Sequence, residues 1–389
     1  MDTLRARFRR AARTAVGLGA LVALVALVAP AAPAHAAVPA TPAATPTFNG
    51  TVWSVAYAGS TIYVGGDFTA AIVRGKSIPR SRLAAINADT GALLDWAPEA
   101  DSRVKAIAVA DGAVYVAGEF AYVNGVKRDS LARLDGQTAA LHSTFRHSIL
   151  GKPYALAAGS GRLYLGGAIT AVNGQTRTRL AAFDLRTGVL DATWRPTADD
   201  QVEALVTYGS RVYVGGKFHK INGVSGSARL AALRPDTGAV DPGFDPAPAY
   251  IAFSVAVTAA GVYAAHGGPG GRVAAYDHSG ASRWTLTMDG DPQAVAAFDG
   301  TVYIGGHFDN VCRSSRTGDQ GVCLDGNIPR VKLAAASATD GQVLPWTANG
   351  NGVTGVHTLA SSEALGKLAV GGAFTMINGI SQKRFAQFG

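Results

Sequence analysis

The sequence contains few of the residues that usually carry chemistry. Of its 389 residues, 16% are charged, two are cysteines and eight are histidines. No Cys-x-x-Cys spacing occurs, which argues against a metal-binding or reactive thiol pair. His-x-His, His-Glu-x-x-His and Gly-x-Ser-x-Gly patterns are also absent, so the sequence carries no signature of a zinc centre or of a serine nucleophile. No segment shows a helical period in its apolar residues, which predicts an all-β chain.

The charge of the chain is modest once an export signal is set aside. Residues 1–36 are predicted to be a secretory signal peptide, because a stretch with five arginines precedes an apolar run at 15–29 and a small-x-small triplet at 34–36. An uncleaved amphipathic anchor is the alternative. The segment holds five arginines and one acid, a net of +4, so about +4 of the chain's +8 remains on the exported part.

These features restrict the partners that we expect. A charge of this size without a concentrated basic stripe argues against a nucleic-acid partner. No cysteine directly follows the apolar run, which argues against a lipid anchor, and no apolar tail closes the sequence, so no membrane anchor is expected. We expect a monomeric secreted protein, extracellular or associated with the cell wall, with no cofactor and no metal.

A repeat of about fifty residues dominates the rest of the sequence. One copy contains Val212-Tyr213-Val214-Gly215-Gly216, an Asn-Gly turn, the run Arg229-Leu230-Ala231-Ala232-Leu233 and the aromatic Phe244. Each copy predicts four short strands separated by turn residues, and four-stranded units repeated radially form a β-propeller. The Gly-Gly pair at the end of the second strand suggests a bulge or a positive φ.

The number of copies predicts seven blades. Positions equivalent to Tyr213 recur seven times, at Tyr63, Tyr115, Tyr164, Tyr213, Tyr263, Tyr303 and Ala369. Fourth-strand aromatics also recur seven times, at Phe48, Trp96, Phe145, Trp194, Phe244, Trp284 and Trp346. The two series are out of phase at the ends, so we expect an N-terminal strand around Phe48 to complete the C-terminal blade. An open solenoid is the alternative.

The domain prediction follows from this pattern. After the signal, residues 37–46 are predicted to be a flexible leader rich in Ala, Pro and Thr, and residues 47–389 a single seven-bladed propeller. Cys312 and Cys323 lie in an insertion of the sixth copy. Because the chain is predicted to be exported, we expect them to form a disulfide.

The copies that carry Tyr-x-Gly-Gly-x-Phe, Asn-Gly, Leu-Ala-Ala and Thr-Gly resemble the bacterial delta-60 repeat β-propellers, and they are similar to the repeats of fungal cortical polarity-marker proteins. The resemblance covers nearly all of residues 48–389. It implies a secreted or surface-displayed propeller and implies no particular reaction. The fifth copy departs from the pattern, because Ala265 and His266 replace the Gly-Gly pair.

Loop lengths predict which face could bind a ligand. The second-to-third-strand connections and the crossovers between copies are long and emerge on the same face of a propeller, here named the long-loop face. The candidate ligand-binding residues on this face are Asp67, Glu119, Lys217, His219, His266, His307 and Asp309. The crossover acids Asp101, Asp199, Asp200 and Asp291 are further candidates, and His357 could face the channel or lie in the core. Solvated loop residues without a shared task are the alternative interpretation.

The sequence therefore predicts an extracellular binding or interaction scaffold that binds a glycan or a protein through the long-loop face. The alternative is a hydrolase or lyase acting on a glycan or polymer, with acids and histidines at the mouth of the propeller. A purely structural surface protein is a third hypothesis. The fold by itself does not separate these functions.

Overall fold

The structure is a computed structural model that describes residues 38–389, so the predicted signal peptide lies outside the described residues. The described chain is built of β-strands and one short 3₁₀ turn, η1 (Asp319–Gly321). This confirms the all-β prediction. In residues 38–389 no helix is long and apolar enough to cross a membrane.

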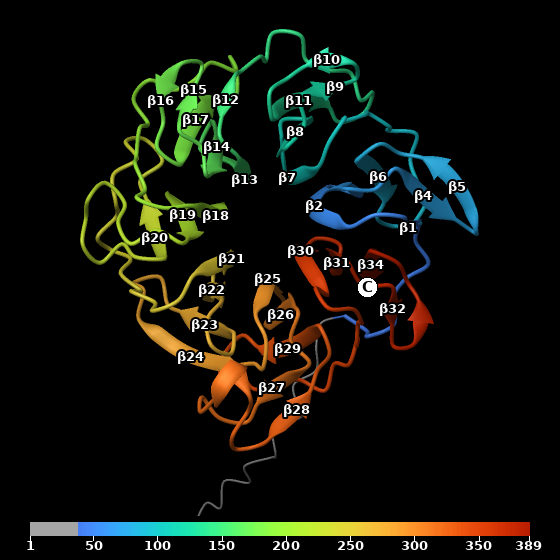
Figure 1. Cartoon of the computed structure of the whole chain (residues 1–389), viewed down its shortest axis with the longest axis vertical. Helices are drawn as coiled ribbons and strands as arrows, with labels where there is room; N and C mark the ends of the chain where they lie inside the picture. The colour runs from blue at the N-terminus through green and yellow to red at the C-terminus, as the bar shows by residue number, and fades with distance from the viewer. Residues whose placement is uncertain (1–37) are drawn as a thin grey trace, which may run out of the picture. The chain divides into compact units, whose positions relative to one another are not determined.

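The strands form antiparallel sheets arranged around a central axis (Figure 1). The first strand of each sheet lies nearest the axis. These strands are β2 (Val52–Ala58), β7 (Val104–Ala110), β13 (Pro153–Gly159), β18 (Val202–Tyr208), β21 (Ala252–Thr258), β25 (Pro292–Phe298) and β30 (Val356–Ser362). Each first strand contacts the first strand of the next sheet, and β30 contacts β2.

The second and third strands follow outward in the same order in every sheet. The second strands are β3 (Thr61–Gly66), β8 (Ala113–Gly118), β14 (Arg162–Gly167), β19 (Arg211–Gly216), β22 (Gly261–His266), β26 (Thr301–Gly306) and β31 (Lys367–Gly372). The third strands are β6 (Leu83–Asn87), β11 (Leu131–Asp135), β17 (Leu180–Asp184), β20 (Leu230–Leu233), β23 (Arg272–Tyr276), β29 (Leu333–Ser337) and β34 (Phe385–Phe388).

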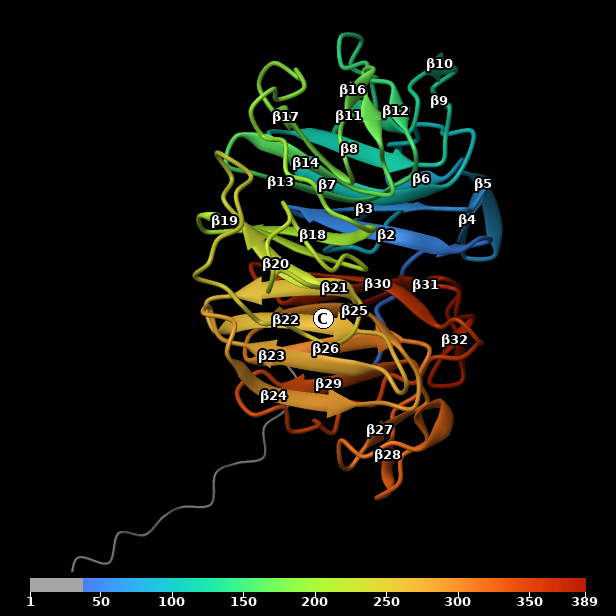
Figure 2. The same ribbon diagram turned by 60° about the vertical axis from the view of Figure 1, so that its left-hand side comes forward.

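The fourth strands are shorter than the sequence predicted. In the described chain β24 (Ser282–Thr287) is a complete fourth strand, and it extends the sheet of β21 to β23 (Figure 2). In other sheets the fourth strand is reduced to a single bridge to the third strand. The bridging residues are Leu93, Leu141, Leu190, Val240 and Val343.

The connections between second and third strands fold into peripheral hairpins. The hairpins are β4 (Ala70–Val73) with β5 (Lys76–Pro79), β9 (Tyr122–Val123) with β10 (Val126–Lys127), β15 (Ala171–Val172) with β16 (Gln175–Thr176), β27 (Asn310–Cys312) with β28 (Asn327–Pro329) and β32 (Met376–Ile377) with β33 (Ile380–Ser381). Two short strands add to these hairpins, β1 (Thr47–Phe48) on β4 and β12 (Ile149–Leu150) on β15.

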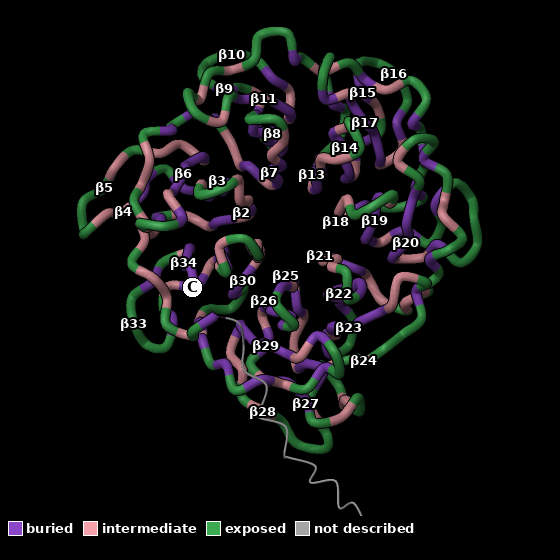
Figure 3. Tube along the Cα trace, turned by 180° about the vertical axis from the view of Figure 1, so that it is seen from behind, coloured by how far each residue is buried: buried purple, intermediate pink, exposed green. Residues whose placement is uncertain are grey.

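The core lies between neighbouring sheets, and Figure 3 shows the exposed stretches on the peripheral connections. Second strands are covered on both faces; all six residues of β8, for example, are buried. The predicted fourth-strand aromatics pack between sheets. The ring of Trp96 meets that of Tyr63 edge to face, and its Nε1–H donates to the Asp135 carbonyl of the next sheet. These aromatics therefore stabilise the contact between units.

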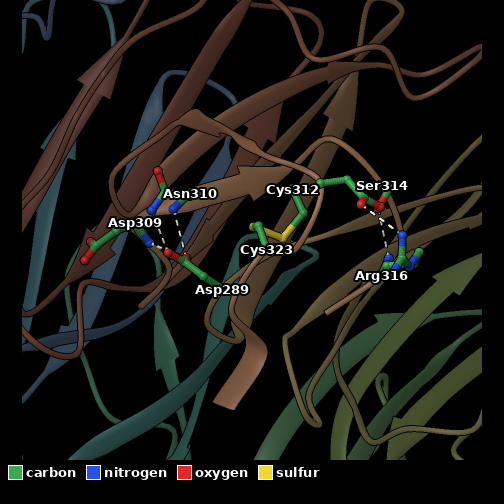
Figure 4. Close-up of a disulfide and its surroundings, with 8 residues drawn as sticks. Asp289, Asp309, Asn310, Cys312, Ser314, Arg316 and Cys323 are labelled. Carbon is green, nitrogen blue, oxygen red and sulfur yellow. Dashed lines mark hydrogen bonds and ion pairs between the residues drawn. A yellow bond between two sulfur atoms is a disulfide. The ribbon is translucent and has the colours of Figure 1, made fainter. Parts of the chain in front are cut away.

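Crossover acids hold the peripheral hairpins to the sheets. Asp289 Oδ1 accepts the backbone N–H groups of Asp309 and Asn310 at 2.8 and 2.9 Å, and the latter begins β27 (Figure 4). Asp101 and Asp199 were predicted as candidate ligand-binding residues, and they accept backbone N–H groups at the equivalent turns. Their carboxylates therefore hold the connections between second and third strands in place.

The predicted disulfide is present between Cys312 and Cys323 (Figure 4). It ties β27 to the loop that follows η1 and closes a separation of 11 residues. The disulfide therefore stabilises the peripheral insertion of this repeat rather than the core.

The N-terminal segment differs in register from the prediction. The strand around Phe48 pairs with β4 of its own repeat rather than with β34. The contact with β34 is made earlier in the chain, where Ala43 N–H donates to the Gln387 carbonyl at 2.7 Å. Leu94 N–H makes the corresponding bond to the Ala85 carbonyl. Ala43, within the segment predicted to be leader, thus contacts β34 through a backbone hydrogen bond.

Candidate functional site

A ring of side chains surrounds the axis at one end of the first strands. Every first strand has a register irregularity after its first residue, as between Val52 and Ser54 of β2, so its second residue is left without a partner in the ladder. These second residues, here named the axial ring, are Trp53, Lys105, Tyr154, Glu203, Phe253, Gln293 and His357.

The axial ring lines a cavity of about 430 Å³, here named the axial cavity. Its walls below the ring are the small and aliphatic residues that follow on the first strands, such as Ser54 and Ala155. Trp53 hydrogen-bonds to Asp67, which directly follows the second strand. The ring therefore lies at the end of the sheets from which the second-to-third connections leave, the long-loop face. Cavities of this size accept small molecules or single units of a polymer.

Trp53 is the centre of a charged and aromatic cluster on one side of the cavity. The ring of His357 stacks on it at 4.2 Å between centroids, and Lys105 Nζ lies 3.6 Å from its centroid. Its Nε1–H donates to Asp67 Oδ2 at 2.9 Å. These contacts fix the indole plane at the cavity wall.

Arg103 couples this cluster to two of the predicted acids. Its guanidinium binds both oxygens of Asp67, at 2.6 and 3.1 Å, and lies 3.9 Å from Glu119 Oε2. Burial alone would raise the pKa of Asp67, but the hydrogen bonds from Arg103 and Trp53 outweigh it and lower that pKa. Asp67 is therefore ionised at neutral pH and orients Trp53.

The opposite side of the cavity carries Glu203. Its Oε1 accepts a hydrogen bond from Gln201 Nε2 at 2.5 Å and lies 3.6 Å from Lys217 Nζ. Burial raises the pKa of Glu203, and the nearby Lys217 ammonium and the Gln201 amide oppose that shift. Among the residues that line the cavity, Glu203 is the one carboxylate.

His357 is held neutral beside Gln293. Its Nδ1 lies 2.6 Å from Gln293 Oε1, so Nδ1 carries the hydrogen of this bond. Burial, followed by the charge of Lys105, lowers the pKa of His357 to about 4. At neutral pH the imidazole is therefore uncharged, and it contributes an aromatic face and a hydrogen bond to the wall of the cavity.

The structure brings some of the predicted site residues to the mouth. Asp67, Glu119 and Lys217 contact the axial ring or the arginine beside it, as described above. His307 lies near the crossover, where its Nε2 accepts the Asp291 N–H at 3.3 Å. Burial raises the pKa of Asp291, and His307 partly offsets this rise.

The remaining predicted residues are engaged elsewhere. Asp309 pairs with Lys332 Nζ at 2.7 Å, and His219 Nε2 accepts a hydrogen bond from Arg229 at 2.7 Å. His266 is 2% exposed and does not line the axial cavity. Its two nitrogens lie 3.2 Å from the Tyr250 carbonyl and the Tyr276 hydroxyl. Within residues 38–389 no group of three or more His, Cys, Asp or Glu side chains could hold a metal ion.

Sequence reasoning missed six of the seven residues of the axial ring; it considered His357 as a channel residue. A signal was present in the repeat itself. Each first strand begins with an apolar residue or proline, then a variable large residue, then Ser, Ala or Thr, then an aliphatic one. A large side chain that changes type from copy to copy, between positions that stay apolar and small, indicates a side chain facing an open axis.

Solved structures with this arrangement of sheets define the class of protein. The structure of U3-55K matches with a TM-score of 0.56 at 13% identity, over 90% of this chain and 99% of that one. The crystal structure of the RRP9 WD40 repeats gives a TM-score of 0.53 at 11% identity, over 87% and 94% of the two chains. Together with the sheet arrangement, these likenesses establish the fold as a β-propeller, as predicted.

The family comes from the sequence match. The family model described as "Outer membrane protein assembly factor BamB" matches residues 37–264, which is more than half of the chain. The chain belongs to this β-propeller family. No curated protein matches the chain. The delta-60 resemblance remains a prediction from the repeat motifs.

Proposed function

We propose that this protein is a secreted binding scaffold that takes a glycan in the axial cavity. The observation that carries the proposal is the axial ring, which places Trp53, Tyr154 and Phe253 around one concave space together with Gln293, Glu203 and Lys105. Flat aromatic faces stack on sugar rings, and amide and charged groups bind hydroxyls. Ligand sites combine such apolar walls with a few polar groups. A concave cavity suits a sugar unit better than it suits a flat protein surface.

The same proposal includes the closure of the scaffold. We infer seven blades joined into a ring, with residues 38–46 as the last strand of the final blade. The inference is supported by the contact of β30 with β2 and by the bond from Ala43 to Gln387. Gln387 Nε2 also donates to the Ala88 carbonyl of the first repeat at 2.6 Å. A closed ring would hold the seven ring residues at fixed separations. Export follows from the signal in residues 1–36.

The cavity favours binding over hydrolysis. Glycoside hydrolysis ordinarily needs two carboxyl groups facing the scissile bond. Glu203 stands alone among the lining residues, and Asp67, outside that lining, is held by Arg103.

The proposal is tested by calorimetric titration of the purified protein with a panel of cell-wall and plant glycans. Trp53→Ala and Phe253→Ala should each weaken binding of the recognised glycan about tenfold or more, because each removes an aromatic wall. Tyr122→Ala is the matched control, since Tyr122 is 47% exposed on the peripheral strand β9. Equal affinity in all variants, or no glycan binding by the wild type, would overturn the proposal.

A further inference from the structure

We infer that the axial cavity is built for a sugar that carries a carboxylate, and that Lys105 is the group that binds this carboxylate. The inference rests on the proposed glycan-binding function and specifies the ligand. It starts from the pairing of charges at the mouth of the cavity.

Lys105 lies half-buried in the wall of the axial cavity, at the second position of β7. Its Nζ contacts the face of Trp53 at 3.6 Å. Within residues 38–389 this ammonium makes no hydrogen bond and no ion pair, so its three N–H donors have no protein acceptor.

Two cations beside the axial ring are paired with acids. Arg103 binds Asp67 through two hydrogen bonds, and Lys217 lies 3.6 Å from Glu203. Further out, Lys332 binds Asp309. Lys105 is the one cation of the axial ring, and its partner would have to come from outside the protein.

The electrostatic surroundings of Lys105 favour an incoming anion. Burial, followed by the charge of Arg103, lowers the pKa of Lys105, and the charges of Glu119, Asp67 and Glu203 partly offset this shift. A ligand carboxylate in contact with Nζ would restore the lost solvation and stabilise the ammonium. Because Glu203 faces the same cavity, the ligand carboxylate is expected on the Lys105 side and its neutral hydroxyls on the Glu203 side.

The rest of the ring accepts the body of such a sugar. Tyr154 follows Lys105 around the ring and Phe253 follows Glu203, so aromatic side chains alternate with polar ones. A uronic acid unit presents a flat apolar face, several hydroxyls and one carboxylate. Each of these features has a counterpart among the residues of the axial ring.

The test compares three trisaccharides by calorimetry: trigalacturonate, its methyl ester and neutral galactotriose. An acidic tripeptide serves as a carboxylate from another source. The acid should bind at least about tenfold more tightly than the ester, and added salt should reduce this preference. Lys105→Gln should abolish the preference, and Lys105→Arg should retain most of it. Lys76→Gln, at an exposed position of β5, is the control and should change nothing. The melting temperature of each variant verifies that it is folded.

Each contrary outcome has one meaning. Equal affinity for the acid and the ester would overturn the role of Lys105 and leave the glycan proposal standing. If the Lys105→Gln variant still prefers the acid, another group binds the carboxylate, and the role of Lys105 is overturned. If the protein binds no trisaccharide and no glycan of the wider panel, whether or not it binds the tripeptide, both proposals are overturned.

Discussion

Trp53 shows at the scale of the residue how this scaffold builds a site. The bulge in β2 frees its side chain from the ladder, Asp67 fixes its indole nitrogen, and His357 and Lys105 contact its ring. These contacts hold the indole ring at the wall of the axial cavity, where the proposed glycan would stack on it.

One prediction at the scale of the residue concerns pH. His266 is buried, and burial lowers its pKa from 6.5 to about 4. Between these values the unfolded chain binds a proton that the folded chain does not, so this histidine's contribution to stability is complete above pH 6.5 and is lost as the pH falls toward 4. The loss amounts to about 3 kcal/mol. Urea unfolding at pH 7 and pH 4.5 should show a smaller acid destabilisation for His266→Gln than for the wild type. Identical losses in the two proteins would contradict this account.

The position of a single residue could be predicted from the sequence where it depends on neighbours along the chain. Asp67 and Glu119 directly follow their strands, so the repeat indicates that they lie beside the long loops, and both contact Arg103. Trp53, Arg103 and His357 come from different repeats, and their contact depends on the closing of sheets around an axis. His266 departs from the repeat motif and was therefore a candidate ligand-binding residue. In the structure its two ring nitrogens contact the Tyr250 carbonyl and the Tyr276 hydroxyl.

At the scale of the element, the Gly-Gly pair marks a bulge in the ladder, as the sequence suggested, but not a positive φ. The sequence suggested a positive φ or a bulge. Gly65 and Gly66 are not among the positive-φ glycines, and the bulge lies on the facing strand, β2. The glycines allow neighbouring strands to pack closely. A Cβ on Gly65 would lie 2.7 Å from Val104 Cγ1 of the next sheet, and a Cβ on Gly66 would clash with the Thr51 carbonyl oxygen.

This geometry predicts unequal effects for two glycine substitutions. Gly66→Ala should destabilise the protein by about 3 kcal/mol, because the backbone of Thr51 must move. Gly75→Ala is the comparison: Gly75 lies in the turn between β4 and β5, where no atom is within 4 Å of an added Cβ and φ is +81°. It should cost about 1 kcal/mol from backbone strain alone. Denaturant unfolding of the two variants measures both costs, and equal values would show that close approach is not the reason for the Gly-Gly pair.

At the scale of the whole molecule, the sequence predicted a β-propeller, and the solved structures of similar fold confirm it. The strand that would join its ends is a finer prediction, and here the structure pairs Phe48 with β4. The repeat count depends on motifs that recur in every copy. The N-terminal strand has no such motif, because residues 38–46 lack the aromatic and aliphatic pattern of the other fourth strands. Its place is set by backbone hydrogen bonds such as that from Ala43 to Gln387, which residue type does not encode.

The closure is testable by removing one donor. Ala43→Pro deletes the N–H that bonds to the Gln387 carbonyl and should destabilise the protein by about 2 kcal/mol. Thr41→Pro is the matched control, because Thr41 is exposed and its N–H makes no backbone bond within the described residues. The melting temperature should fall in the first variant and stay near the wild-type value in the second. Equal melting temperatures for Ala43→Pro and the wild type would contradict a closing strand at 38–46.

The central claim is that the axial cavity is the binding site, and the most direct measurement is a crystal structure of the protein soaked with the glycan that it binds most tightly. The account predicts density for one sugar unit inside the axial ring, stacked on Trp53, Tyr154 or Phe253. If the sugar carries a carboxylate, that group should lie within hydrogen-bond distance of Lys105 Nζ. Density for the glycan on another surface, with the axial cavity filled by water alone, would contradict it.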